Sequence, residues 1–353
     1  MDFCKEAGVT STHAKGLFRN AYKNLSPTPW VSPSDGPLVA PPLFPKKLSS
    51  LMDREFIAEG LFIREAAISK YDGSVKFSLE LSDHLVINAV LMPESKRLTL
   101  CLSSQVGCRQ ACVFCSSARM GFKRNLSAGE IVGQVVTANR WLATHPNWLC
   151  EKKLSSSMHL TNVVFMGMGE PLDNTDAVTK AILIMNSPWG LNLPLRHISV
   201  STVGHLDGLR QLLSNIPDVR IALSVNAASD EKRSKLMPIN KRFPLTHLLN
   251  DLAELTKHQK HSLLIQYLLL QDFNDGPAEA EELASLLKNL RVKVNLIPYN
   301  PPYDDSLKSA LKSPDPERVA RFKDVLYHKG IRVMTRYSKG QDIGAACGHL
   351  IVF

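Results

Sequence analysis

Short segments rich in β-branched and aliphatic residues alternate with segments of helical spacing from residue 98 onward. This alternation predicts a parallel sheet whose strands are joined by crossover helices. About six or seven such units favour an incomplete (βα)-barrel over a flat doubly wound sheet, and barrels carry their chemistry at the C-terminal ends of the strands. The predicted strands are 98–102, 162–166, 198–201, 220–225, 263–270, 293–297 and 331–335, and the predicted helices are 127–143, 175–187, 245–258, 278–290 and 315–329.

The first predicted helix of the barrel carries a start signal. Ser127 stands before it and Glu130 follows three residues later, a capping box that satisfies two backbone donors. Ile131, Val135 and Leu142 then fall on one side of the helix. We expect this side to pack against the sheet.

The first 80 residues are expected to form a small accessory module, and residues 81–353 the main domain. A short helix is predicted around His13–Lys23. Residues 26–46 hold seven prolines, too many for regular structure, and indicate an extended segment. The stretch 47–80 is predicted to be a small helix followed by strands, with Asp72-Gly73 in a hairpin turn.

Composition restricts the class of protein. The chain of 353 residues is 44% hydrophobic and 21% charged, which excludes wholesale disorder. No apolar run approaches the roughly 18–20 residues of a membrane helix, and the first residues lack the pattern of a secretory signal. We therefore expect a cytoplasmic protein without a membrane partner.

Seven cysteines are unevenly placed along the chain. An odd number in a long chain argues against a disulfide framework. Cys108, Cys112 and Cys115 form a CxxxCxxC motif just after the first barrel strand. Three thiolates on one loop can hold three corners of an iron–sulfur cube and leave the fourth iron open. A zinc site with Cys101 as fourth ligand is the alternative.

The CxxxCxxC spacing resembles that of radical S-adenosylmethionine (SAM) enzymes, and four longer motifs resemble the RlmN/Cfr family of RNA methyltransferases. These motifs are TLCLSSQVGC at 99–108, GMGEPL at 167–172, NLIPYNP at 295–301 and DIGAACG at 342–348. Matching segments extend from about residue 60 to about residue 350. The resemblance implies an α/β fold with a partial (βα)-barrel of the radical SAM type, a [4Fe–4S] cluster on the three motif cysteines, and SAM as cofactor.

The resemblance also implies roles for two cysteines outside the cluster motif. Cys347 takes a methyl group from one SAM, and a radical made from a second SAM removes a hydrogen atom from that methyl group. The resulting carbon radical adds to an adenine carbon that is not nucleophilic. Cys101 then attacks Cys347, and the disulfide that forms releases the methylated RNA. The alternative for each cysteine is an inert buried thiol.

The SAM pocket is expected at the strand ends. Gly169 lets the backbone approach closely, and the carboxylate of Glu170 can meet the SAM ammonium group. The resemblance completes this pocket with Ser201, Ser224, Val225, Asn226 and Asn300. Taken singly, a serine or asparagine after a strand is more often a turn former.

Two positions depart from the family pattern. Ser224-Val225-Asn226 stands where the family commonly has Ser-Leu-His, and asparagine does not titrate near neutrality. Asn88 stands where the family carries a glutamate proposed to accept a proton, and asparagine cannot act as a general base. Another group or water takes that proton, or the reaction or substrate differs. Glu94 lies nearby and is expected to be a solvated surface carboxylate.

A net charge of +9 fits a polyanionic partner. A basic patch is expected from the cluster Lys232, Arg233, Lys235, Lys241 and Arg242, with Lys123 and Arg124 beside the cysteine loop. The resemblance implies an RNA substrate, ribosomal RNA of the large subunit first and transfer RNA second, and an electron donor such as flavodoxin or ferredoxin. Methylation at carbon 2 of adenine is favoured. The alternatives are carbon 8 as in Cfr, an RNA-binding homologue without turnover, and a zinc-stabilised RNA-binding module.

Overall fold

The computed structural model describes residues 11–22, 61–155, 158–301 and 310–350. Within these residues ten strands form one sheet, in the order β1-β2-β3-β4-β7-β8-β9-β10-β11-β12. The strands are β1 (Phe62–Ile68), β2 (Val75–Glu80), β3 (Val86–Glu94), β4 (Arg97–Leu102), β7 (Asn162–Phe165), β8 (Ile198–Thr202), β9 (Arg220–Ser224), β10 (Leu263–Leu269), β11 (Val292–Pro298) and β12 (Val333–Thr335).

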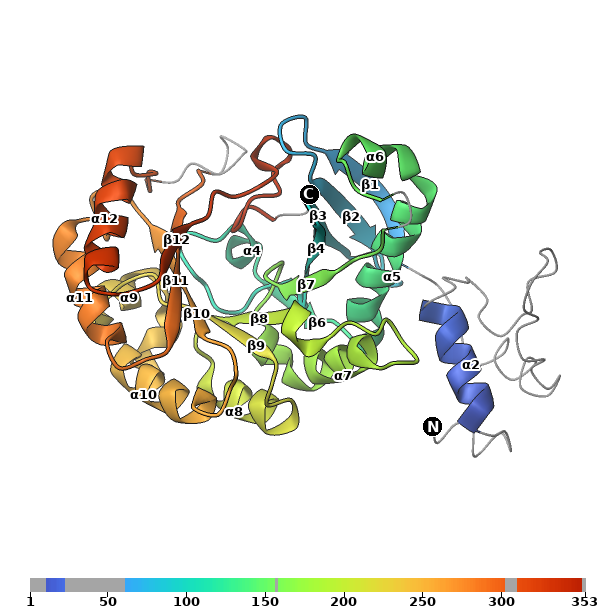
Figure 1. Cartoon of the computed structure of the whole chain (residues 1–353), viewed down its shortest axis with the longest axis horizontal. Helices are drawn as coiled ribbons and strands as arrows, with labels where there is room; N and C mark the ends of the chain where they lie inside the picture. Colours follow the sequence, from blue (N-terminus) through green and yellow to red (C-terminus); the bar gives the residue numbers. More distant parts are fainter. Residues whose placement is uncertain (1–10, 23–60, 156–157, 302–309, 351–353) are drawn as a thin grey trace.

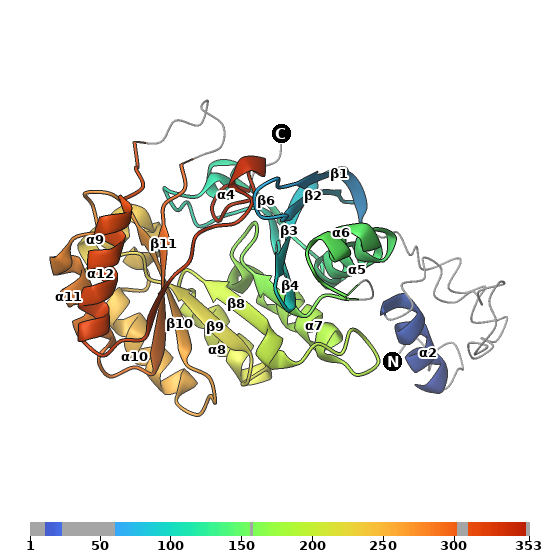
Figure 2. The same cartoon turned by 45° about the horizontal axis from the view of Figure 1, so that its top comes forward.

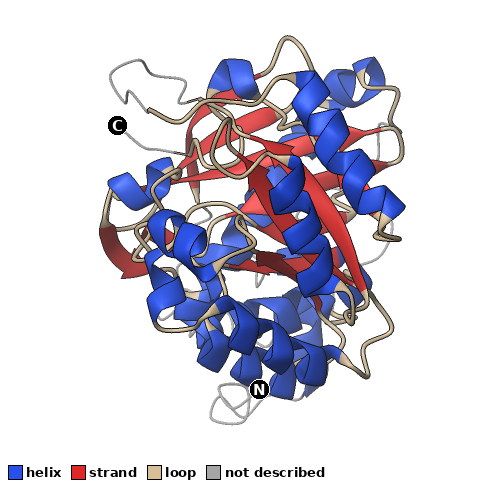
Figure 3. Cartoon of the chain, turned by 90° about the vertical axis from the view of Figure 1, so that its left-hand side faces the viewer, coloured by secondary structure: helices blue, strands red, loops and turns tan. Residues whose placement is uncertain are grey.

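From β4 onward every neighbouring pair of strands in this sheet is parallel. The helices of the connections are α4 (Ser116–Arg119), α5 (Ala128–Thr144), α6 (Pro146–Glu151), α7 (Thr175–Asn186), α8 (Leu206–Asn215), α9 (Asp230–Leu236), α10 (Leu245–Thr256), α11 (Pro277–Leu287) and α12 (Pro316–His328). The longer ones, such as α5, α7, α10 and α12, lie along the outer side of the curved sheet, whereas α4 lies near the centre of the view (Figures 1 and 2). Coloured by secondary structure, the strands are seen to run inside this layer of helices (Figure 3).

The predicted partial (βα)-barrel is confirmed, and each predicted strand and helix of the barrel has its counterpart. α8 was not predicted, because Gly208 and a length of 10 residues weaken its helical pattern. α2 (Ser11–Tyr22) confirms the short N-terminal helix. The proline-rich segment 26–46 and the small helix expected just after it lie outside the described residues.

The barrel strands continue into an antiparallel extension. β1 pairs with β2, β2 with β3 and β3 with β4, all antiparallel. The hairpin turn predicted at Asp72-Gly73 joins β1 to β2, and Gly73 has the positive φ of +74° that glycine tolerates. The proposed module boundary at residue 80 falls between β2 and β3, and the division of the chain there stays a prediction.

α5 has the capping box that its sequence predicts. The Ser127 hydroxyl accepts a hydrogen bond from the Glu130 backbone N–H at 3.1 Å, and the Glu130 carboxylate accepts one from the Ser127 N–H at 2.7 Å. Ile131, Val135 and Leu142 are buried in the main hydrophobic core. The cap fixes where the helix starts, and the buried side chains fix which side faces the sheet.

The tip of the β1–β2 hairpin is tied to the C-terminal segment by two reciprocal hydrogen bonds. The Asp72 carboxylate accepts from the Gly340 N–H at 2.8 Å, and the Asp342 carboxylate accepts from the Lys70 N–H at 3.0 Å. Asp72 also accepts from the N–H of Ser74 within its own turn. This clasp joins the antiparallel extension to the segment that leads to Cys347.

Among the described residues, no helix combines the length and apolar character that a membrane crossing requires.

Replacing Asp72 by alanine is expected to lower the free energy of unfolding by about 1–2 kcal/mol, because two backbone donors lose their acceptor. Burial raises the pKa of Asp72, but the hydrogen bonds from Gly340 and Ser74 outweigh it and leave the pKa below its ordinary value. The stabilisation is therefore complete above about pH 4 and is lost as the pH falls further. Thermal melting of D72A and wild type at neutral and acidic pH measures both effects.

Glu94→Ala is the control for this comparison. Glu94 forms an exposed ion pair with Arg97 in the β3–β4 hairpin, and such pairs contribute about 0–1 kcal/mol. Equal melting temperatures for D72A and E94A at neutral pH would show that the clasp does not stabilise the protein.

Candidate active site

The cysteine loop begins and ends on a small two-stranded sheet. β5 (Gln105–Gly107) pairs antiparallel with β6 (Phe122–Asn125), and the Cys108 N–H donates to the Gly121 carbonyl at 3.2 Å. Gly107 has φ +76°, and a Cβ there would lie 1.7 Å from the Gly121 oxygen, so only glycine allows this approach. The loop that carries the three motif cysteines is therefore closed at its base.

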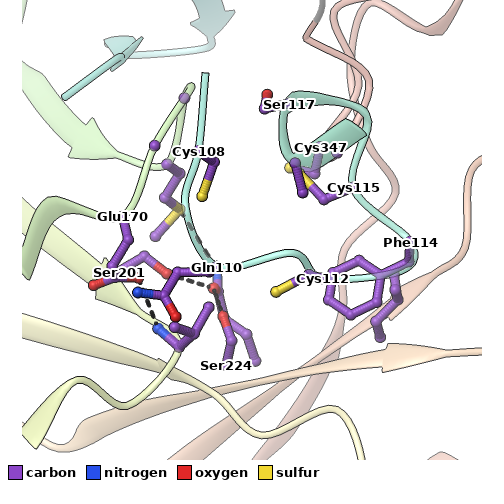
Figure 4. A pocket seen from close by; sticks show the side chains of 18 of the residues that line it. Cys108, Gln110, Cys112, Phe114, Cys115, Ser117, Glu170, Ser201, Ser224 and Cys347 are labelled. Atoms are coloured by element: carbon purple, nitrogen blue, oxygen red, sulfur yellow. Dashed lines mark hydrogen bonds between the residues drawn. The ribbon is translucent and has the colours of Figure 1, made fainter. Parts of the chain in front are cut away.

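Cys108, Cys112 and Cys115 line one large pocket (Figure 4). About 1070 Å³ of this pocket is not filled by protein atoms, part of it open to solvent. Cys112 packs in an apolar cluster with residues such as Met237 and Tyr299. The pocket has the largely apolar lining, with a few polar groups, of a small-molecule site.

Burial raises the pKa of all three thiols, and the like charge of their neighbours adds to it. The pKa of Cys108 rises to about 12. Three neighbouring thiols that are hard to ionise are suited to binding a metal group. Metal coordination removes their protons and balances the negative charge of the thiolates. The donor set therefore fits the [4Fe–4S] cluster that the sequence leads us to expect.

Within the described residues, no three His, Cys, Asp or Glu side chains are grouped to bind a metal ion. A structural zinc ion needs its ligands at about 2.0–2.3 Å from one centre. An iron–sulfur cube binds each thiolate through a different iron and does not require the sulfurs to meet at one point. The side chains as placed thus fit a cluster better than a zinc ion, and the zinc site with Cys101 as fourth ligand stays the alternative that metal analysis decides.

Polar side chains from three successive strand ends line the same pocket. Glu170 follows β7, Ser201 lies near the end of β8, and Ser224 and Asn226 lie at the end of β9. Gly169 also lines it with φ +97°, and a Cβ there would lie 2.5 Å from the Gln105 side chain. The structure thus brings together five of the seven residues predicted for SAM binding.

The Glu170 carboxylate is almost completely buried. One oxygen accepts from the Leu172 N–H at 3.1 Å and the other from the Val203 N–H at 3.0 Å. Burial nevertheless raises the pKa of Glu170 to about 7. A buried carboxylate in this state gains from a cationic partner that enters the pocket.

Gln266 on β10 joins the serines and was not predicted. Its side-chain oxygen accepts from the Ser201 hydroxyl at 2.9 Å and from the Ser224 hydroxyl at 3.4 Å. It also lines the pocket. The signal was available in the sequence, since Gln266 is the polar residue inside the apolar run 263–270.

Val225 and Asn300 are not among the residues that line the pocket. The Val225 N–H donates to the Gln266 carbonyl at 2.9 Å. The Asn300 amide group donates to the Ser338 hydroxyl at 2.8 Å, and its oxygen accepts from Gln341 at 2.9 Å. Asn300 thereby holds the segment before Cys347, and its SAM-binding role stays a prediction.

Cys101 and Cys347 line a second, smaller cavity. Cys101 lies on β4, opposite Val90 of β3 and Val164 of β7. Cys347 and Met166 line both cavities, so the smaller one is adjacent to the pocket of the three motif cysteines. Two thiols far apart in the sequence thus line one small cavity, and their joint role in catalysis stays a prediction.

Several curated proteins are similar to this chain over most of its length. The dual-specificity RNA methyltransferase RlmN of Syntrophobacter fumaroxidans is 38% identical over 98% of this chain and 93% of its own. The RlmN of Lawsonia intracellularis is 44% identical over 79% of this chain and 76% of its own. The chain belongs to the RlmN family. A scan against protein-family models matches none.

A solved structure agrees with this RlmN assignment. The crystal structure of a radical SAM methyltransferase from Sphaerobacter thermophilus has a TM-score of 0.86 and 33% identity, over 99% of this chain and 95% of that one. The similarity therefore covers both the antiparallel extension and the barrel. It confirms the radical SAM type of partial barrel.

Asn226 and Asn88, the two departures from the RlmN/Cfr pattern, both form hydrogen bonds within the fold. Asn226 has φ +58°, a left-handed conformation that asparagine tolerates well, and its side-chain oxygen accepts from the Leu268 N–H at 3.0 Å. Asn88 is 1% exposed on β3, accepts from the Ser78 hydroxyl at 3.3 Å, and lines neither cavity. Both asparagines thus serve hydrogen bonding within the fold.

The basic patch expected at 232–242 is reduced by ion pairs and by burial, whereas Lys241 is exposed. Lys232 pairs with Glu279, Lys235 with Glu231 and Arg242 with Asp207, and Arg233 is buried. Beside the cysteine loop, Arg124 pairs with Asp83 and Glu130. Charge counted along the sequence does not reveal acidic neighbours supplied by other segments. Lys123 is exposed on β6.

The buried Arg233 side chain forms hydrogen bonds with the segments that follow β8 and β9. Its guanidinium donates to the carbonyls of Val203 at 2.6 Å and Val225 at 3.1 Å, and to the Asn240 side chain at 2.6 Å. Burial lowers the pKa of Arg233 to about 10, while the charge of Cys112 opposes this change. The network fixes the loops that follow β8 and β9, next to the strand ends that carry Ser201 and Ser224.

Arg233→Met is expected to lower the free energy of unfolding by about 3 kcal/mol or more, because buried carbonyls lose their donor. The melting temperature should fall by roughly 2–4 °C for each kcal/mol. Arg242→Met is the control, since Arg242 is exposed and forms a surface ion pair. Equal melting temperatures of R233M and R242M would contradict a structural role for Arg233.

Proposed function

We propose that this chain methylates a carbon of an adenosine base in RNA through a methylated cysteine, with SAM as the methyl donor. The observation that carries the proposal is that Cys101 and Cys347 line one cavity, which is adjacent to the pocket of the three motif cysteines. Membership of the RlmN family supports the same reaction.

Cys108, Cys112 and Cys115 would hold the cluster, because all three line the pocket and their thiols are costly to ionise without a metal. When bound together, the cluster and SAM supply a transferable methyl group and a 5′-deoxyadenosyl radical. Glu170 would bind the SAM ammonium group, since its buried carboxylate gains from a cationic partner. Ser201 and Ser224, oriented by Gln266, would donate to polar groups of SAM.

Cys347 is proposed to accept the methyl group on its Sγ and, after loss of one hydrogen atom, to join that carbon to the adenine ring. Cys101 Sγ then attacks Cys347 Sγ. Before this attack, the radical adduct would return one electron to the oxidised cluster and lose the hydrogen of the ring carbon to water as a proton. The bond between Cys347 Sγ and the carbon then breaks as the disulfide forms, and the electron pair of that bond takes up a proton to complete the methyl group on the base. This last step needs two thiols within bonding reach, which the shared cavity supports.

The substrate class follows from the named relatives, which are dual-specificity RNA methyltransferases. We propose large-subunit ribosomal RNA as the first substrate and transfer RNA as the second, with carbon 2 of adenine as the methylated position. We propose flavodoxin or ferredoxin as the electron donor, and the cytoplasm as the location, because free thiols persist there.

Mass spectrometry of nucleosides from RNA treated with the cluster-loaded protein tests the function. Wild type is expected to give 2-methyladenosine. Cys347→Ala should lower methylation at least about a hundredfold because the carbon carrier is lost. Cys101→Ala should leave RNA covalently attached to Cys347, detected as a protein–RNA adduct in denaturing gels.

Cys150→Ala is the control for both variants, because Cys150 is an exposed cysteine that lines neither cavity. Methylation that survives in C347A would refute the methyl-cysteine route. SAM cleavage without any methylated nucleoside would refute the methyltransferase and favour the RNA-binding homologue. Methylation at carbon 8 would correct the position while keeping the chemistry.

Anaerobically purified protein is expected to be brown, with absorption near roughly 400 nm and bound iron. Cys112→Ala should remove most of this absorption and iron because one corner of the cluster loses its ligand. Cys150→Ala should retain both. Colourless wild-type protein with bound zinc would contradict the cluster assignment.

A further inference from the structure

The small cavity of Cys101 and Cys347 also contains two cationic side chains. Arg336 and Lys339 line it, together with apolar residues and Met92 and Met166. About 340 Å³ around these residues is not filled by protein atoms, and this volume includes open solvent at the mouth of the cavity. Two thiols and two cations thus share one space, and neither cation is assigned a role by the reaction described above.

The backbone of Arg336 is held by the sheet. Arg336 follows β12, and its backbone N–H donates to the Leu296 carbonyl of β11 at 2.8 Å. Its two terminal guanidinium nitrogens lie 3.9 Å from the sulfur atoms of Met92 and Met166. Thioether sulfur is a weak acceptor, so these contacts orient the group without neutralising it.

No carboxylate within the described residues forms an ion pair with Arg336, unlike Arg124 or Arg318. Lys339 differs from Arg336 in having a strong acceptor, because its ammonium group donates to the Pro93 carbonyl at 3.1 Å. The guanidinium charge of Arg336 therefore remains available to the cavity.

A nearby positive charge would favour ionisation of the buried Cys101 thiol. It is 7% exposed, and burial raises its pKa to about 12, with a further rise from Cys347 and an opposing effect from Arg336. Its strand partners Val90 and Val164 are uncharged, so the charged and titratable groups around Cys101 are Cys347, Arg336 and Lys339. A thiol in this environment is a poor nucleophile, because the thiolate is the reacting form.

We propose that Arg336 is the positioning residue that keeps Cys101 able to react as a thiolate. The proton of Cys101 passes to water, and the guanidinium compensates the negative charge left on sulfur. Arginine suits the task because it stays charged when partly buried and is more weakly hydrated than lysine. The use of this thiolate to attack Cys347 rests on the proposed function, whereas the effect of Arg336 on Cys101 does not.

The test measures the alkylation of Cys101 by iodoacetamide in the cluster-loaded protein, without SAM or RNA, from about pH 7 to about pH 10. Mass spectrometry of the Cys101 peptide gives the rate for this cysteine alone. Arg336→Met removes the charge at similar side-chain length, and Arg336→Lys restores it. Arg332→Met is the matched control, because Arg332 is an exposed arginine on the same segment that does not line the cavity.

R336M is expected to raise the apparent pKa of Cys101 by about one unit, which lowers the thiolate fraction about tenfold at neutral pH. Since a more basic thiolate is also more reactive, the alkylation rate should fall about threefold. R336K should recover most of the wild-type rate, and R332M should match wild type. Arg336→Gln gives the same comparison if R336M does not fold.

A profile of R336M that superimposes on wild type would overturn the proposal, as would an equal shift in R332M. A wild-type Cys101 that resists alkylation over the whole range would also overturn it, since no reactive thiolate would then form. Methyl transfer is not measured here. Failure of the proposed methylation and failure of the Arg336 proposal are therefore separate results.

Discussion

Parallel pairing from β4 to β12 is the constraint on which the rest of the structure depends. It directs the C-terminal ends of these strands to one edge of the sheet, where the loops converge. Glu170 after β7 and Ser224 on β9 line one pocket for this reason, and Cys101 on β4 lines the cavity beside it. A shift of one residue in any strand would turn such a side chain to the opposite side of the sheet.

The C-terminal segment is not part of this sheet, and hydrogen bonds from separate parts of the chain hold it over the barrel. Asp72 of the β1–β2 hairpin binds the Gly340 N–H, and the Asn300 carbonyl accepts from the His349 ring at 2.8 Å. The cysteine loop contributes as well, since the Ser117 hydroxyl donates to the Leu350 carbonyl at 2.7 Å. Cys347 lies between these attachments. Its approach to Cys101 therefore depends on elements that contact neither sulfur.

Much of the fold could be predicted from the sequence, because periodicity and caps are local. The capping box of Ser127 and the strand near Cys101 were both predicted from neighbouring residues. The meeting of Cys101 with Cys347 followed from the resemblance to a family, since no spacing rule joins residues so far apart. The ion pairs of the basic patch could not be predicted, because Lys232 and Arg242 have their acidic partners, Glu279 and Asp207, in other segments. The role of Gln266 appears only when three strand ends come together.

The same physical problem arises at both groups of sulfur atoms, and the chain answers it in the same way. Burial opposes thiolate charge at Cys112 and at Cys101 alike. Near Cys112 lies Arg233, which donates to carbonyls and amides but forms no ion pair with a described carboxylate, and near Cys101 lies Arg336. An arginine neutralised by an acid would contribute little to a neighbouring sulfur. Leaving both guanidinium groups without acidic partners keeps positive charge where the proposed chemistry develops negative charge.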